Sequence, residues 1–349
     1  MQINIHSKIK DYTLHFSRDF WSDLAEIKPK IVIADSNVLR LYQEKLSVFD
    51  KDEIITFNAV EQNKNMNSVF ELCDKVMSYS AKKNITIISF GGGITQDVTG
   101  FLSSVLYRGV NWVFVPTTLL AQADSCMGSK TSLNYKHFKN LLGSFYPPSQ
   151  VFIDTEFTKT LTEVDFYSGL GEIVKLHLMG TEQHLLQITD ALSKDIRNDD
   201  VLLDKLVRNS LQIKYSYIKD DEFDTGRRNL LNFGHDFGHA LETTSNYKIP
   251  HGIAVVLGMI FANKIAVKRG LLDNDIAERR YEQILSKCIK CPLQKEYFDK
   301  QGLLTAMKMD KKRVGDGLPL IVLKNNFELE KLLDITPEEL FWGIDEMQV

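Results

Sequence analysis

Cysteine is scarce in this 349-residue sequence, and that scarcity excludes a secreted disulfide scaffold. Four cysteines are too few for a disulfide framework in a chain of this length. Cys288 and Cys291 form a CxxC pair, but the sequence has no second pair to complete a zinc cage. We interpret the cysteines as thiols of a reducing compartment and therefore expect a cytoplasmic protein.

Long apolar runs and an excess of charge of either sign are also missing. No run approaches the roughly 18 apolar residues of a membrane helix, and the alternating first residues lead us to expect no signal peptide. The 42 basic and 46 acidic residues nearly balance, giving a net charge of −4. This balance produces no overall field for nucleic acid or an anionic membrane, so we expect neither as a partner.

The pattern of apolar segments changes near residue 155. The earlier part alternates like a hairpin over 2–7 and 11–16 and then contains short apolar runs at 30–35, 53–57, 86–90, 112–116 and 151–154. Strands followed by helical patterns predict a parallel sheet with binding loops at the strand ends. The later part is helical almost throughout. We predict a Rossmann-like α/β domain at 1–155 and an all-α domain at 156–349.

A glycine turn follows the predicted strand 86–90. Gly91, Gly92 and Gly93 precede a helical pattern, and such a turn lets backbone N–H groups hold a pyrophosphate at a helix N-terminus. Gln96 stands where a dinucleotide fingerprint has its third glycine, so a tight turn without a ligand is the alternative. Asp35 and Glu61, at or after neighbouring strands, are candidates for binding ribose hydroxyls.

The stretch 116–140 is polar, rich in Thr, Ser, Asn and Lys, and shows little periodicity. We predict a long functional loop, because loops of this length inside compact domains are usually functional or disordered. Its basic and amide side chains suit an anion such as phosphate, with solvated lysines as the alternative. The candidates are Lys130, Lys139 and Asn140 within the stretch and Arg108 before it.

Several histidines gather between residues 228 and 251. If 228–242 is one helix, Arg228, Asn232, His235 and His239 lie along one face, and His251 follows after a loop. Neutral imidazoles suit zinc-like ions, which also need another donor. Glu172 is the candidate, although Glu172 and Lys175, one turn apart, could form only an ion pair. Histidines satisfied in the core are the alternative for this stretch.

Several motifs in this chain jointly resemble the 3-dehydroquinate synthases, members of the sugar phosphate cyclases. In family order, over about residues 61–323, they include GGGITQDVTGF, VPTTLLAQADSCMGSKTSLN, KNLLGSFYPP, GLGEIVK, LLNFGHDFGHALE and MDKK. The resemblance implies a nucleotide-binding α/β domain, a helical domain, bound NAD, a divalent metal (zinc or cobalt) and a homodimer.

The resemblance also implies roles for individual positions. The metal ligands are Glu172, His235 and His251. The remaining catalytic and substrate positions are Lys175, Lys214, Arg228, Asn232 and His239. The substrate phosphate is held by Arg108 from the partner subunit, Lys130, Asn140, Lys311 and Lys312. We assign to the cofactor Asp35, Asn37, Glu61, Lys64, Gly91, Gly92, Gly93, Asp97, Thr117, Thr118, Asp124, Lys130, Lys139, Phe157 and Thr160.

The family reaction is a step of the shikimate pathway. It converts a seven-carbon 2-keto sugar acid phosphate (DAHP) to 3-dehydroquinate, with phosphate elimination and recycled NAD. The sequence departs from the family pattern at Gln96, Ser129, Asp236 and Ile253, the last replacing a glutamate. The alternatives are a related cyclase acting on glucose 6-phosphate or sedoheptulose 7-phosphate, a metal-dependent NAD(P) alcohol dehydrogenase, and a cofactor-binding protein without activity.

Overall fold

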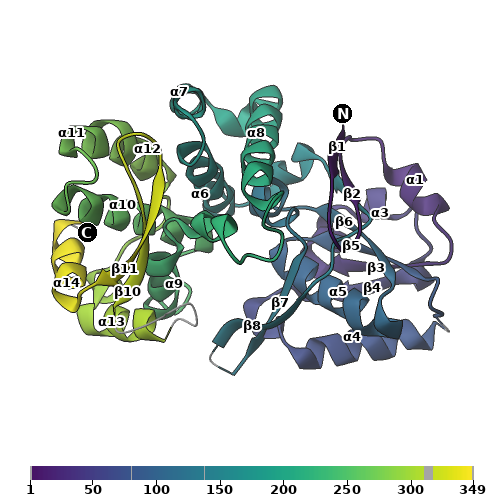
Figure 1. The fold of residues 1–349 in the computed structure, drawn as a ribbon. Helices are drawn as coiled ribbons and strands as arrows, with labels where there is room; N and C mark the ends of the chain where they lie inside the picture. Colours follow the sequence, from purple (N-terminus) through teal and green to yellow (C-terminus); the bar gives the residue numbers. More distant parts are fainter. Residues whose placement is uncertain (1, 80, 137, 310–316, 348–349) are drawn as a thin grey trace. The chain divides into compact units, whose positions relative to one another are not determined.

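The structure is a computed structural model that describes residues 2–79, 81–136, 138–309 and 317–347. The chain divides into two compact units (Figure 1). Unit 1 comprises Met1–Thr160 and Ile218–Phe223, and unit 2 comprises Leu161–Tyr217 and Asp224–Val349. The main division therefore falls at Thr160, and a short later segment also belongs to unit 1.

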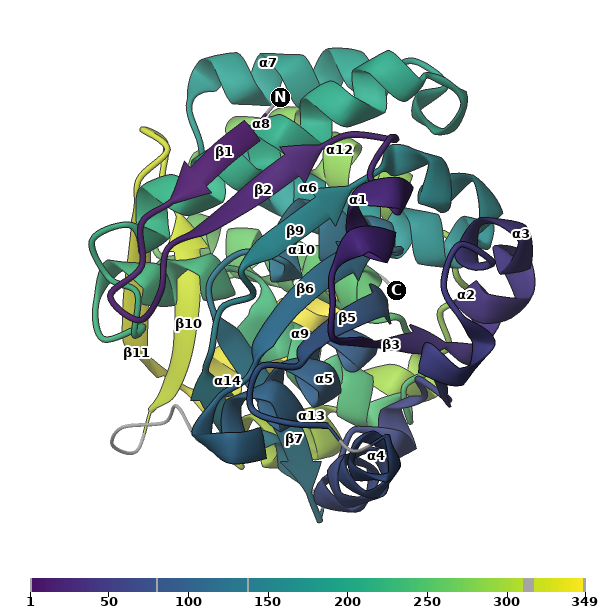
Figure 2. The same ribbon diagram turned by 90° about the vertical axis from the view of Figure 1, so that its right-hand side faces the viewer.

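A seven-stranded sheet forms the centre of unit 1, in the order β1-β2-β9-β6-β5-β3-β4. Figure 2 shows this order from β1 to β3. β1 and β2 pair antiparallel, and the other neighbours pair parallel, which confirms the predicted hairpin and parallel sheet. The strands are β1 (Gln2–Ile5), β2 (Tyr12–Phe16), β3 (Lys30–Asp35), β4 (Ile54–Phe57), β5 (Thr86–Gly91), β6 (Asn111–Pro116) and β9 (Gln150–Ile153).

The central strands of this sheet are apolar on both faces. Every residue of β5 is buried, and a cluster containing Val32, Ile88 and Val113 forms much of the core. Strands covered on both sides read as continuous apolar runs, which is why the sequence revealed them. The helices of unit 1 are α1 (Trp21–Glu26), α2 (Ser36–Leu41), α3 (Gln43–Leu46), α4 (Met66–Ser78) and α5 (Gly93–Val105).

The predicted long loop at 116–140 is wrong. A short π-helical turn at Ala121–Ser125 leads into the antiparallel hairpin of β7 (Lys130–Tyr135) and β8 (Phe138–Phe145). In β7, Thr131 and Leu133 are buried while their neighbours are not, an alternation too short and too polar to stand out in the sequence.

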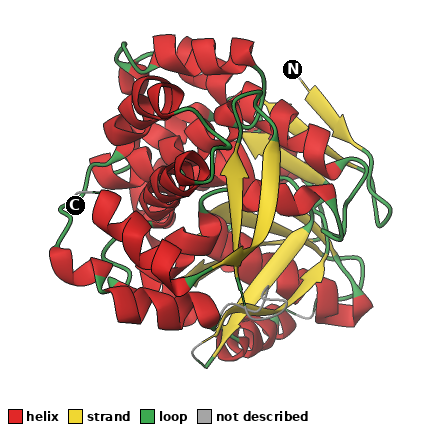
Figure 3. Cartoon of the chain, turned by 60° about the vertical axis from the view of Figure 1, so that its left-hand side comes forward, coloured by secondary structure: helices red, strands yellow, loops and turns green. Residues whose placement is uncertain are grey.

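Within its described residues, unit 2 is helical apart from one hairpin, β10 (Leu318–Leu323) with β11 (Leu329–Ile335), which the all-α prediction did not contain (Figure 3). The helix bounds are α6 (Glu163–Leu178), α7 (Glu182–Ala191), α8 (Asp200–Ile218), α9 (His235–Thr244), α10 (His251–Lys268), α11 (Asn274–Ile276), α12 (Gln283–Leu285), α13 (Lys300–Lys308) and α14 (Pro337–Glu346).

Helix α10 is the core helix of unit 2. By length and composition it is apolar enough to cross a membrane, but it is mostly buried inside the protein, as core helices are. Gly252 lets it approach α6, because a side chain there would overlap the carbonyl of Ser168. Gly258, further along α10, allows a second close approach, because a side chain there would overlap the carbonyl of Gly234, the residue before α9. These close approaches pack α10 directly against α6 and against the residue that precedes α9.

Candidate active site

Three helices of unit 2 bring a carboxylate and two imidazoles together. Glu172 lies on α6, His235 begins α9 and His251 begins α10. Glu172 Oε1 is 3.5 Å from His235 Nε2 and 3.4 Å from His251 Nε2, and one ligand atom from each residue lies within 4.8 Å of the other two. Within the described residues this buried Oε1 has no hydrogen-bond partner. One oxygen and two nitrogen donors around a common point suit a zinc-like cation.

Lys175 occupies the other oxygen of the same carboxylate. Its Nζ lies 2.5 Å from Glu172 Oε2, and both side chains are almost completely buried. Burial alone would raise the pKa of Glu172, but the charge of Lys175 and the contact with His251 outweigh it and hold the pKa at about 2. The ion-pair reading and the ligand reading are therefore compatible, because each carboxylate oxygen faces a different partner.

The single helix predicted over 228–242 is wrong. Residues Arg227–Asn232 form a short 3-10 turn, and α9 starts only at His235. The interruption is Gly234, whose φ of +78° is left-handed and whose hypothetical Cβ would lie 2.5 Å from the carbonyl oxygen of Val255. Helical periodicity therefore does not align Arg228 and Asn232 with the histidines.

His239 is the third imidazole near this centre. It lies one turn after His235 on α9, with ring centroids 5.3 Å apart, and its ring is 5.8 Å from that of His251. Lys214 and Arg228 are buried, and Asn232 donates from Nδ2 to the carbonyl of Asn229 at 2.8 Å. Two predicted phosphate ligands, Lys311 and Lys312, lie outside the described residues.

Sequence reasoning missed Glu242. Its buried carboxylate Oε2 lies 3.2 Å from Nδ1 of His251, and its ligand atom is within 4.8 Å of those of His239 and His251. Burial alone would lower the pKa of His251, but Glu242 and Glu172 outweigh it and raise the pKa to about 10. The available signal was spacing, since Glu242 follows His239 by three residues and shares its helix face. The orientation of the loop before His251 could not be read from the sequence.

The glycine turn of unit 1 joins β5 to α5 as predicted. Gly92 is the N-cap residue of α5, and no side chain there accepts a hydrogen bond from the first N–H groups of the helix. A side chain at Gly91 would overlap Thr95, and one at Gly92 would lie 2.9 Å from Thr118. Only glycine fits at these two positions, which precede the N-terminus of α5. An uncapped helix N-terminus of this kind is suited to binding the phosphates of a dinucleotide.

Gln96, which replaces a glycine of the fingerprint, has a structural partner. Its Nε2 donates to the carbonyl of Ser125 at 2.7 Å, and the Ser125 hydroxyl donates back to its Oε1 at 2.6 Å. The side chain thus connects α5 to the π-helical turn. This substitution replaces a glycine by a buried, doubly hydrogen-bonded link.

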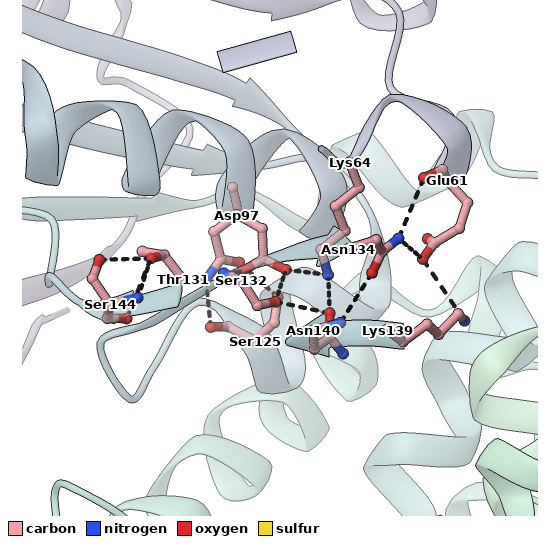
Figure 4. A network of polar contacts seen from close by, with 11 residues as sticks. Glu61, Lys64, Asp97, Ser125, Thr131, Ser132, Asn134, Lys139, Asn140 and Ser144 are labelled. Atoms are coloured by element: carbon pink, nitrogen blue, oxygen red, sulfur yellow. Dashed lines mark hydrogen bonds and ion pairs between the residues drawn. The ribbon is translucent and has the colours of Figure 1, made fainter. Parts of the chain in front are cut away.

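Five of the predicted cofactor and phosphate positions meet in one polar network between α5, the segment 61–64 and the β7–β8 hairpin (Figure 4). Lys64 Nζ lies 2.5 Å from Asp97 and 2.6 Å from Asn140 Oδ1. Lys139 Nζ is 3.8 Å from Glu61. Asn134, not predicted, links the two pairs by donating to Glu61 at 2.8 Å and accepting from the Asn140 N–H at 3.0 Å.

The other predicted positions of unit 1 lie in several separate places. Asp35 caps α2 by accepting from the Asn37 N–H at 2.9 Å. The Thr118 hydroxyl accepts from the Ala121 N–H, and Thr160 lies 3.0 Å from the Tyr42 hydroxyl. Phe157 and Thr117 are buried, Asp124 is half-buried in the π-helical turn, and Arg108 and Lys130 are exposed.

The fold is shared with known cyclases and dehydrogenases. A structure of 2-deoxy-scyllo-inosose synthase with carbaglucose-6-phosphate, NAD+ and Co2+ matches with a TM-score of 0.86 at 24% identity, covering 99% of this chain and 100% of the other. The 2-epi-5-epi-valiolone synthase of Streptomyces hygroscopicus, with NAD+ and Zn2+ bound, matches with 0.87 at 22%, covering 99% of both. An iron-containing alcohol dehydrogenase matches with 0.65 at 15%, covering 96% of both.

Sequence comparison is more specific. The family models for the N-terminal and C-terminal parts of 3-dehydroquinate synthase match residues 54–168 and 169–313. The 3-dehydroquinate synthase of Campylobacter concisus is 34% identical over 97% of this chain and 99% of its own length, and that of Clostridium tetani is 36% identical over 90% and 84%. The chain belongs to the 3-dehydroquinate synthase family.

Proposed function

We propose that this protein is a 3-dehydroquinate synthase, a phosphate-eliminating carbon–oxygen lyase that converts DAHP to 3-dehydroquinate and recycles its NAD. The observation that carries the proposal is the convergence of Glu172, His235 and His251 on one point in a chain of this family. We further propose a soluble cytoplasmic homodimer without nucleic-acid or membrane partners.

The two cofactors have different places in this proposal. When bound, a divalent metal supplies Lewis acidity and NAD accepts and returns a hydride. Glu172 Oε1 and the Nε2 atoms of His235 and His251 would hold the metal, while Lys175 keeps Glu172 ionised. The glycine turn and the Lys64–Asp97 network of unit 1 would hold NAD, together with the other cofactor positions predicted from the sequence.

The remaining residues bind the substrate and move protons. His239 is the proposed proton carrier, because its half-buried imidazole lies beside the two ligand histidines. Arg228 is proposed to bind the substrate carboxylate, since a guanidinium pairs with carboxylates in bidentate fashion. Its side chain is 4% exposed, so the pairing takes place largely away from water. Lys214 and Asn232 are proposed as further substrate contacts, and Arg108 of a partner copy, Lys130, Asn140, Lys311 and Lys312 as the phosphate contacts.

Phosphate release from three substrates tests the function. The purified protein, NAD and Co2+ or Zn2+ are incubated separately with DAHP, glucose 6-phosphate and sedoheptulose 7-phosphate. We expect phosphate from DAHP alone, with no net NADH. Release from one of the other sugars would identify a related cyclase, NADH equal to product would identify a dehydrogenase, and no release from any substrate would favour a protein without activity.

Arg228→Ala sharpens this test. The substitution removes charge-assisted hydrogen bonds worth about 1.5–3 kcal/mol. It should therefore lower kcat/KM for DAHP about 10- to 100-fold and kcat/KM for a neutral sugar phosphate far less. Arg227→Ala is the matched control, because Arg227 is exposed and lies over the ring of Tyr217 instead. Equal losses for both substrate types would show that Arg228 reads no carboxylate.

A further inference from the structure

We infer that Glu242 is the positioning residue of the metal centre: it accepts a hydrogen bond from His251 Nδ1–H and so turns the Nε2 lone pair of that imidazole toward the metal. This inference rests on the proposed function, because it requires the triad to bind a metal. It assigns a role to a side chain that is neither a proposed ligand nor a proposed substrate contact.

Two carboxylates bracket the His251 ring. Glu242 Oε2 lies 3.2 Å from Nδ1, and Glu172 Oε1 lies 3.4 Å from Nε2. Binding a metal through Nε2 requires the neutral imidazole, which carries one N–H, and donation of that N–H from Nδ1 to Glu242 would leave the Nε2 lone pair for the metal. That tautomer is the one a metal ligand needs, and a carboxylate acceptor on the other nitrogen makes the ligand more basic.

His235 has a corresponding but weaker arrangement. Its Nδ1 lies 3.3 Å from the carbonyl oxygen of Phe233, just before the Gly234 turn. Both ligand imidazoles therefore have an oxygen acceptor at Nδ1 and point Nε2 at the same carboxylate oxygen. Only His251 has a charged acceptor, so its orientation is the one that a single side-chain substitution can disturb.

The loop after α9 is folded so that Glu242 and His251 meet. The carbonyl of Glu242 accepts from the Tyr247 N–H at 2.8 Å and from the Ser245 hydroxyl at 3.2 Å. The Ser245 hydroxyl in turn accepts from the Ile249 N–H at 3.4 Å. These bonds reverse the chain at the end of α9 and place the start of α10 beside the Glu242 side chain, which is 6% exposed.

Ile253 and Asp236, two positions that depart from the family pattern, do not affect the contact between Glu242 and His251. In α10, residue 253 is rotated by about 200° from His251 around the helix axis, so its side chain points away from the imidazole. Ile253 is completely buried in the core. Asp236 is rotated by about 100° from His235 on α9, which also directs it elsewhere. Glu242 supplies the carboxylate for His251 without either position.

Metal affinity tests the inference without relying on turnover. Metal-stripped protein is titrated with Co2+, followed by its visible absorption, and then with Zn2+ against a chromophoric chelator. Loss of an outer-sphere partner typically weakens metal binding 10- to 100-fold. We expect Glu242→Gln, which keeps an acceptor oxygen but no charge, to weaken both metals about 10-fold, and Glu242→Leu about 100-fold, with an altered Co2+ spectrum.

Glu282→Gln is the matched control, because it also removes a carboxylate of unit 2, one that pairs with Lys264 at 3.0 Å. It should leave metal affinity within about twofold, below the effect of an outer-sphere loss. Circular dichroism of the metal-free variants verifies folding, and the near-isosteric Gln variant provides the decisive value if the Leu variant does not fold.

Unchanged Co2+ and Zn2+ affinity in Glu242→Gln, or an equal loss in Glu282→Gln, would overturn the positioning role. A wild-type protein that binds neither metal would instead refute the proposed function. The two failures are therefore distinguishable in the same titration.

Discussion

The Glu61–Lys139 pair of the polar network in unit 1 and the Glu172–Lys175 pair of the carboxylate–histidine centre in unit 2 hold their charges in different ways. In unit 1, Glu61 and Lys139 are 3.8 Å apart and each side chain remains about a third exposed, at 32% and 27%. In unit 2, Glu172 and Lys175 are 2.5 Å apart and at most 2% exposed. A half-exposed charge retains water as a partner, whereas a buried charge depends on its neighbours. Removal of the lysine should therefore cost far more stability at the Glu172–Lys175 pair than at the Glu61–Lys139 pair.

The largest expected effect is the loss of a ligand. His235→Ala should reduce metal affinity by more than about 100-fold, beyond the range for an outer-sphere partner, and abolish turnover. The metal content of the purified protein measures the loss of binding, and the rate of phosphate release measures the loss of turnover. His184→Ala is the control, since His184 lies on α7 and caps that helix. Unchanged metal content in His235→Ala would refute the ligand role.

The comparison of the two ion pairs is tested next. Removing one member of a buried pair typically costs about 3–5 kcal/mol, whereas an exposed pair contributes about 0–1 kcal/mol. Lys175→Met should therefore lower the free energy of unfolding of the metal-free protein several-fold more than Lys139→Met, as measured in urea. The double variant Lys175→Met, Glu172→Gln should recover part of the loss, because no uncompensated charge stays buried. Equal effects of the two lysine variants would contradict the comparison.

Buried histidine gives a smaller, pH-dependent effect. His177 on α6 donates from Nδ1 to the carbonyl of Ile173 at 2.8 Å, and burial lowers its pKa to about 4. Because the ordinary pKa of 6.5 applies to the unfolded chain, the unfolded state binds the proton first as the pH falls.

The stabilisation from neutral His177 is therefore complete above pH 6.5 and is lost between pH 6.5 and about 4, by at most roughly 3 kcal/mol. His177→Leu should remove this part of the acid sensitivity. Urea unfolding of both proteins at several pH values measures the difference, and parallel stability curves would exclude the effect.

The smallest effect is expected at Ser129, one of the positions that depart from the family pattern the sequence resembles. Its φ of +65° is left-handed, which costs a non-glycine residue about 1–2 kcal/mol. Its hydroxyl donates to Glu222 at 3.1 Å, a bond worth about 0.5–1.5 kcal/mol. Ser129→Gly should therefore change stability by less than about 1 kcal/mol in either direction. A larger change in thermal unfolding would show that the two terms do not offset each other.

Sequence patterns predicted the elements whose signal is local. The central strands of the sheet read as apolar runs because both their faces are buried. Local patterns failed where a contact distant in the sequence decides the conformation. Gly234 breaks the predicted helix because α10 packs against it, and Ser132 of the unpredicted hairpin is held by two bonds to Asp97, at 2.9 Å each.

By itself, the sequence determined the residue types available for chemistry: three histidines, a carboxylate one helical turn from a lysine, and a glycine turn after a strand. Family motifs then identified the reaction class. Only the tertiary structure decided which oxygen of Glu172 faces the imidazoles and which carboxylate faces His251. The physical reason is that both choices depend on how closely α6, α9 and α10 pack, which is set by glycines far apart in the chain.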